Sequence, residues 1–88
     1  MVRRRVIVDG RVQGVWFRET CRREAESHGV SGYVHNRPDG RVEAEFEGDA
    51  AAVQAMVDWC RRGPSRAVVT GVDVADVPRT GATNFLVR

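Results

Sequence analysis

Apolar and polar residues follow two periodicities along this chain, and these divide it into strands and helices. Some stretches alternate apolar with polar residues or hold β-branched runs, which is typical of strands in a sheet with one better-buried face. Two intervening stretches repeat apolar residues every three or four positions, which is typical of a helix packed on one side. The predicted strands cover residues 3–9, 30–36, 41–47, 68–77 and 85–87, and the helices begin at residues 17 and 50.

Residues with special backbone or capping properties mark the ends of these elements. Phe17, Cys21, Ala25 and His28 share one face of the first helix, which we expect to end at Gly29 with left-handed backbone. The second helix follows Asp49, a predicted N-cap, and stops before the Gly-Pro pair at residues 63–64. Pro-Asp-Gly at residues 38–40 joins the second and third strands into a hairpin, and Gly71 predicts a bulge in the fourth.

The order strand, helix, strand, strand, helix, strand predicts an α+β fold of the ferredoxin-like split β-α-β type. This fold is an antiparallel sheet of four to five strands with two helices on one face. The third strand alternates apolar residues with Glu43, Glu45 and Glu47, so we expect these glutamates to be solvated and the other face of the sheet to be partly open to water. With 88 residues, the chain is long enough for one two-layer core, and we treat residues 1–88 as a single domain.

Composition narrows the classes of function. No apolar run approaches the roughly 18 residues of a membrane span and no signal peptide is recognisable, so we expect a cytoplasmic protein with no membrane partner. The net charge of +2 is too small to imply a nucleic-acid partner. Cys21, Cys60, His28 and His35 lack the spacing of zinc ligands, so no metal or cofactor is expected, and the cysteines are interpreted as buried thiols.

The residues from Gly10 to Arg18 form a strand-to-helix loop that suits an anion. Glycine at Gly10 and Gly14 allows successive backbone N–H groups to turn inward and form a concave nest. The helix that follows adds unpaired N–H groups and the positive end of its dipole, and Arg18 adds a planar fork of donors. These features favour binding of a phosphoryl group, although the glycines and arginine of the loop alone are also compatible with a loop that only connects the strand to the helix.

Two separated motifs resemble the signatures of the acylphosphatase family. The first reads Gly-Arg-Val-Gln-Gly-Val-Trp-Phe-Arg at residues 10–18. The second reads Gly-Tyr-Val-His-Asn at residues 32–36, followed by Asp-Gly-Arg-Val-Glu at residues 39–43. The resemblance covers essentially the whole chain and implies a sandwich with a fifth strand. It also implies metal-independent hydrolysis of acyl phosphates to a carboxylate and inorganic phosphate, with a small-molecule substrate as partner and a monomeric, free-standing protein.

The resemblance also implies roles for individual residues. Arg18 binds the substrate phosphate, and Asn36 orients the attacking water. Backbone N–H groups of the loop complete the phosphate site, at Gln13, Gly14, Val15, Trp16, Phe17 and Arg18. An asparagine amide can hold water by donating and accepting hydrogen bonds. An asparagine before a turn can also act only as a turn residue that bonds to its own backbone. Trp16 occupies a variable position of the pattern, as a partly exposed lid or a core contact, and Phe17 is expected to pack in the core.

Two other classes of function remain open at this point. A non-catalytic module that binds phosphate or carboxylate would keep the loop without the chemistry. A ferredoxin-like domain can also bind RNA on its open sheet face, which requires aromatic residues on the middle strands. The third strand offers only Phe46, on the apolar side, so the RNA-binding hypothesis is the weaker of the two.

Overall fold

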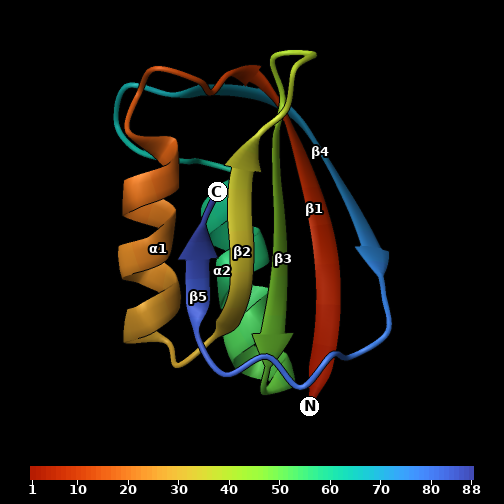
Figure 1. Cartoon of the computed structure of the whole chain (residues 1–88). Helices are drawn as coiled ribbons and strands as arrows, with labels where there is room; N and C mark the ends of the chain where they lie inside the picture. Colours follow the sequence, from red (N-terminus) through yellow and green to blue (C-terminus); the bar gives the residue numbers. More distant parts are fainter.

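The computed structural model describes all 88 residues and places two helices against one face of a five-stranded sheet (Figure 1). This arrangement confirms the predicted α+β sandwich. The elements follow one another as β1 (Val2–Arg11), α1 (Phe17–Ser27), β2 (Ser31–Asn36), β3 (Val42–Gly48), α2 (Ala50–Cys60), β4 (Val68–Asp76) and β5 (Phe85–Val87). Neither helix is long and apolar enough to cross a membrane.

The strands lie in the order β4-β1-β3-β2-β5. The first four pair antiparallel, whereas β5 pairs parallel with β2, so the sheet is mixed and the predicted antiparallel pairing does not extend to the fifth strand. The cause is the loop after β4. It runs along one end of the sheet from the β4 edge to the opposite edge, so β5 enters beside β2 in the same direction (Figure 1). This path brings the last residues of the chain close to the start of α1.

The core lies between the sheet and the helices and contains 18 buried apolar residues. Phe17, the first residue of α1, is 2% exposed, and its ring meets Trp59 of α2 edge-on with centroids 5.1 Å apart. The predicted core position of Phe17 is therefore confirmed. Because truncating a buried phenylalanine costs roughly 3–5 kcal/mol, this contact fixes the beginning of α1, and with it the preceding loop, against the body of the protein.

Gly10 belongs to the sheet, not to the loop. Strand β1 continues through Gly10 to Arg11, two residues beyond the predicted end. A Cβ atom on Gly10 would lie 2.1 Å from the carbonyl oxygen of Val68 in β4, so glycine is required there for close strand pairing. The pairing of β1 with β4 shifts register at this point, since Asp9 pairs with Gly71 and Gly10 with Val69. The irregularity thus lies beside the predicted position.

The part of the open face around Glu47 is buried under ion pairs and a loop, which corrects the prediction that all three glutamates of β3 are solvated. Glu47 is only 5% exposed and Arg3 only 6%. Nη1 of Arg3 lies 3.0 Å from Glu47, and the backbone N–H groups of Thr80 and Gly81 donate to the same carboxylate at 2.8 and 2.9 Å. The bond from Thr80 is the largest of the effects that lower the pKa of Glu47 to about 2. Strand periodicity identified the face but not the loop that covers it.

The predicted helix ends are only partly confirmed. Gly29 ends α1 with φ of 68°, as expected. Asp49 occupies the N-cap position of α2, but its side chain makes no capping hydrogen bond. His28 is an exposed C-cap residue and does not continue the buried face of α1. The two cysteines, Cys21 and Cys60, are free, buried thiols, and burial raises the pKa of the Cys21 thiol.

Candidate active site

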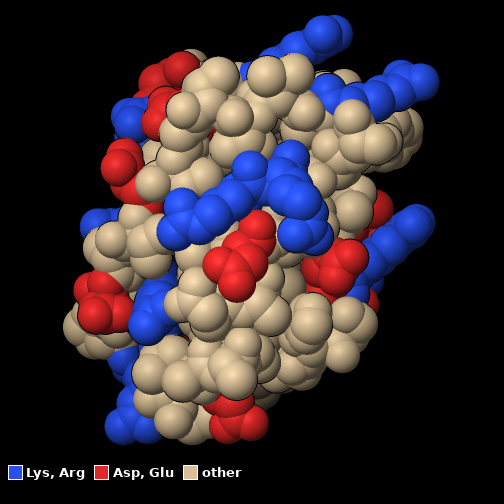
Figure 2. Space-filling model, turned by 180° about the vertical axis from the view of Figure 1, so that it is seen from behind, with Lys and Arg blue, Asp and Glu red and all other residues tan.

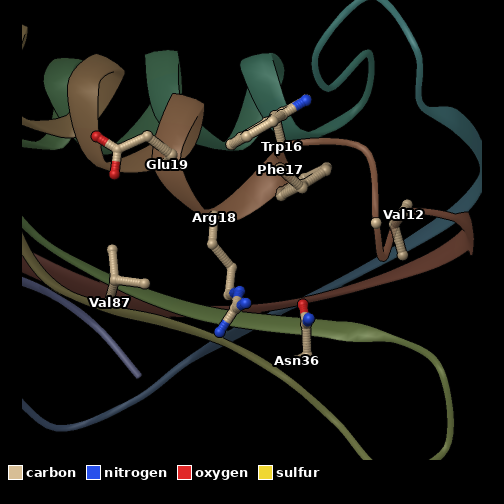
Figure 3. A pocket seen from close by; sticks show the side chains of 8 residues that line it. Val12, Trp16, Phe17, Arg18, Glu19, Asn36 and Val87 are labelled. Atoms are coloured by element: carbon tan, nitrogen blue, oxygen red, sulfur yellow. The ribbon is translucent and has the colours of Figure 1, made fainter.

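A pocket of about 430 Å³ opens where α1 begins, facing the ends of β2 and β5 (Figure 3). Five of the predicted site residues line it, together with three others. The lining residues are Val12, Gly14, Trp16, Phe17, Arg18, Glu19, Asn36 and Val87. The structure therefore brings Arg18 and Asn36 to one cavity, although they come from different elements.

The backbone between β1 and α1 presents a run of unpaired N–H groups. No N–H group from Gln13 to Glu19 donates a hydrogen bond within the protein. Gly14 and Trp16 have φ angles of 74° and 66°, and this alternation with ordinary backbone turns successive N–H groups toward one side. Because the first turn of α1 adds its own unpaired N–H groups, the loop and the helix together form a site suited to an anion.

Arg18 is the positive charge of this pocket. Its Nη1 donates to the backbone carbonyl of Arg88 at 2.9 Å, and the guanidinium extends from α1 toward Asn36 (Figure 3). No carboxylate pairs with Arg18, since the neighbouring Glu19 pairs with Arg22 and Arg23. Arg18 is exposed and retains donors that the protein does not use. Such a group is available for a phosphate or a carboxylate.

Asn36 is the last residue of β2, where the strand enters the turn toward β3. Strand alternation turns the side chains of His35 and Asn36 to opposite faces. His35 lies on the open face, where its Nε2 is 3.4 Å from a carboxylate oxygen of Glu43. Asn36 is therefore on the helix side and lines the pocket.

Gln13 and Val15 do not line the pocket. The side-chain amide of Gln13 donates to the carbonyls of Arg37 and Arg41 at 2.8 and 3.1 Å. This pair of bonds ties the loop to the β2–β3 turn and thus holds Asn36 at a fixed place relative to the N–H groups. Val15 is 5% exposed and packs in the core. Neither side chain reaches the cavity, so each can contribute to a ligand only through its backbone.

Several residues of the site were not predicted from the sequence. Val87 lines the pocket and Arg88 supplies the carbonyl that holds Arg18, because β5 lies parallel beside β2. Nothing in the local sequence indicates this, since the contact depends on the path of the loop after β4. Glu19 could have been included from the sequence, because it directly follows Arg18.

The structure contains no group of three or more His, Cys, Asp or Glu side chains placed to hold a metal ion. The pocket is lined by one carboxylate, Glu19, and by no histidine or cysteine. The chemistry that its residues can offer is therefore hydrogen bonding to an anion, and placement of a small molecule beside it.

The acylphosphatase family model matches residues 4–87. The chain belongs to the acylphosphatase family. It is 58% identical over 85 residues to the acylphosphatase of Rubrobacter xylanophilus, covering 96% of this chain and 77% of the relative. It is 53% identical over 88 residues to that of Methylococcus capsulatus, covering 99% and 96%.

The fold agrees equally well with a solved member of the acylphosphatase family. The crystal structure of acylphosphatase from Bacillus subtilis superimposes with a TM-score of 0.95 at 39% sequence identity. The superposition covers 100% of this chain and 99% of that one. The two folds therefore agree over almost the full length of both chains.

Proposed function

We propose that this protein hydrolyses acyl phosphates with two side chains, Arg18 for the substrate phosphate and Asn36 for the attacking water. The observation that carries the proposal is their meeting at one pocket beside a run of unpaired backbone N–H groups. Arg18 forms no ion pair within the protein, lines the cavity and retains donors that the protein does not use. The products are a carboxylate and inorganic phosphate.

Charge is the main requirement that the phosphate places on this site. A charge-assisted hydrogen bond contributes roughly 1.5–3 kcal/mol, whereas the exposed end of a helix dipole contributes about 0.3–1 kcal/mol. Arg18 therefore outweighs the dipole of α1 as a single contributor. The N–H groups from Gln13 to Glu19 supply further donors in fixed positions, so they need no reorganisation as charge develops on the phosphoryl oxygens.

The water is held by Asn36, whose amide donates one hydrogen bond and accepts another. Neither asparagine nor arginine accepts a proton near neutral pH, so neither group is a general base. A carboxylate is a good leaving group, and a phosphate oxygen of the substrate accepts the proton of the water. The new P–O bond forms to water as the bond to the acyl oxygen breaks. The site thus acts by positioning and charge stabilisation.

The test is hydrolysis of benzoyl phosphate in the presence of a chelator. We expect the wild type to turn over the substrate, and Arg18→Ala and Asn36→Ala to lose on the order of a hundredfold or more in rate while remaining folded. Arg23→Ala is the matched control, because Arg23 is an exposed arginine of the same helix that does not line the pocket. A folded wild type that binds phosphate without turnover would instead favour a non-catalytic phosphate-binding module.

We infer that the protein acts as a cytoplasmic monomer on a small molecule, without a nucleic-acid partner. On the face opposite to that of Figure 1, basic side chains adjoin one another at the centre, where they lie against acidic ones, and others project near the edges (Figure 2). Acidic side chains thus interrupt the basic groups on that face. On the open face of the sheet, Tyr33 is covered by the guanidinium of Arg88 at 4.3 Å and bonded to Glu43 and Glu45, so it offers no free ring for base stacking.

A further inference from the structure

Trp16 combines an exposed side chain with strained backbone at the mouth of the pocket. Its side chain is 74% exposed, and it is the only residue other than glycine with a positive φ, at 66°. A bulky residue in this left-handed region is a conformational outlier, whereas glycine adopts it without strain. The indole contributes little to the core, so folding does not account for a tryptophan here. Strain that is retained in an active site points to a role in function.

The position of Trp16 relative to Asn36 indicates which part of the substrate it meets. Trp16 and Glu19 lie on the α1 side of the pocket, Asn36 and Val87 lie on the strand side, and Arg18 extends between them (Figure 3). In phosphoryl transfer the attacking oxygen and the leaving oxygen are roughly in line through phosphorus. A water held by Asn36 therefore directs the leaving acyl group toward the opposite wall, where the indole lies.

The free surface of that wall is apolar and aromatic. The carboxylate of Glu19 is engaged by Arg22 and Arg23, and the hydrogen bond from Arg22 is the main effect that lowers its pKa. The indole of Trp16 has no aromatic partner within the protein. The tryptophan that pairs with Phe17 is Trp59. An exposed, unpartnered indole offers a flat face on which another planar group can stack.

We propose that Trp16 is a specificity-determining residue that stacks on the acyl group of the substrate. The protein then prefers acyl phosphates with an aromatic or other flat apolar acyl group over those with a small aliphatic one. This inference rests on the proposed function, since it needs the phosphate at Arg18 and the water at Asn36.

The first test compares kcat/KM for benzoyl phosphate and acetyl phosphate, which carry the same phosphate and differ in the acyl group. We expect Trp16→Gly, which keeps the backbone unstrained, to lower the benzoyl-to-acetyl ratio about tenfold, mainly through KM for benzoyl phosphate. Trp16→Phe should retain most of the wild-type ratio. Val74→Ala is the matched control, because Val74 is an exposed apolar residue of β4 away from the pocket, and it should leave the ratio unchanged.

A second test does not depend on turnover. Phenacylphosphonate replaces the bridging oxygen of benzoyl phosphate by a methylene group, and its binding should change the emission of the exposed indole. The change should be absent in Trp16→Phe and should not occur with acetonylphosphonate. An unaltered benzoyl-to-acetyl ratio in Trp16→Gly, or unaltered emission, would overturn the role of Trp16 while hydrolysis by the wild type still supported the proposed function. A wild type that hydrolyses neither substrate would overturn both.

Discussion

Arg3 and Arg18 carry the same side chain in opposite surroundings. Arg3 is 6% exposed and pairs with Glu45 at 2.7 Å and with Glu47 at 3.0 Å. Arg18 is exposed, pairs with no carboxylate and donates only to the carbonyl of Arg88. The first region of the molecule satisfies its charges internally and holds a loop against the sheet. The second leaves most of its donors unused, which is what a site for an external anion requires.

The largest difference should appear on replacing Arg18 by lysine. Arg18→Lys keeps the charge but loses the planar fork that matches two phosphate oxygens, so we expect kcat/KM for benzoyl phosphate to fall about a thousandfold. The free energy of unfolding should change little, because the side chain is exposed. Arg23→Lys, at an exposed arginine of the same helix, should retain wild-type kinetics. Near-normal turnover by Arg18→Lys would contradict two-oxygen binding of the phosphate.

Arg3→Met should show the opposite pattern, with a loss of stability and normal activity. Removing one partner of a buried ion pair leaves uncompensated charge, so we expect a loss of about 3 kcal/mol in the free energy of unfolding measured in urea. Arg4→Met is the matched control on the same strand. The partner of Arg4, Asp76, is 87% exposed, and such a surface pair contributes about 0–1 kcal/mol. Equal losses in the free energy of unfolding of the two variants would mean that the buried ion pair of Arg3 contributes no more than the exposed pair of Arg4.

Asn36→Ala separates positioning of the water from binding of the phosphate within the site. The variant should lower kcat about a hundredfold and change KM little, because the lost interaction positions the nucleophile and not the phosphate. His35→Ala serves as the control, since the neighbouring side chain lies on the other face of the sheet beside Glu43. A rise in KM with unchanged kcat would assign Asn36 to binding in place of water orientation.

The smallest effect concerns pH and tests the ion-paired region around Arg3 and Glu47. The folded-state pKa of Glu47 is lowered to about 2 from an ordinary value of 4.5. The carboxylate therefore contributes stability that is fully present above pH 4.5 and is lost as pH falls toward 2. Thermal unfolding between pH 5 and 2 should show a shallower decline in Glu47→Gln than in the wild type. Parallel declines would mean that Glu47 does not stabilise the loop through Thr80 and Gly81.

The sequence predicted the elements of the sandwich well because their signals are local. Alternation in β3, the helical spacing from Phe17, and the Pro-Asp-Gly turn each act within a few residues. The direction of β5 was not predictable in this way, because it depends on where the loop after β4 leads. The burial of Glu47 depends on the same loop. Both errors thus come from the path of the loop after β4, which the periodicity of apolar residues does not predict.

The candidate site was predicted in part for the same reason. Arg18 and Asn36 stand next to recognisable loop and turn residues, and the structure places both in one pocket. The carbonyl of Arg88 was missed because it reaches Arg18 only through the parallel pairing of β5 with β2. Gly10 was assigned to the loop because a glycine near the end of a strand is compatible both with a loop and with a close approach between strands. The close approach of Val68, which explains it, is a tertiary contact.

The most direct test of the central claim is titration of the ¹⁵N-labelled protein with inorganic phosphate, followed by amide chemical shifts. We expect saturable downfield shifts that are largest for N–H groups between Gly14 and Glu19. The same titration of Arg18→Ala should give shifts that fail to saturate at the same phosphate concentration, while Arg23→Ala should behave as the wild type. Saturable shifts centred elsewhere on the molecule, or equal binding by Arg18→Ala, would contradict the claim that this loop and Arg18 bind the phosphate.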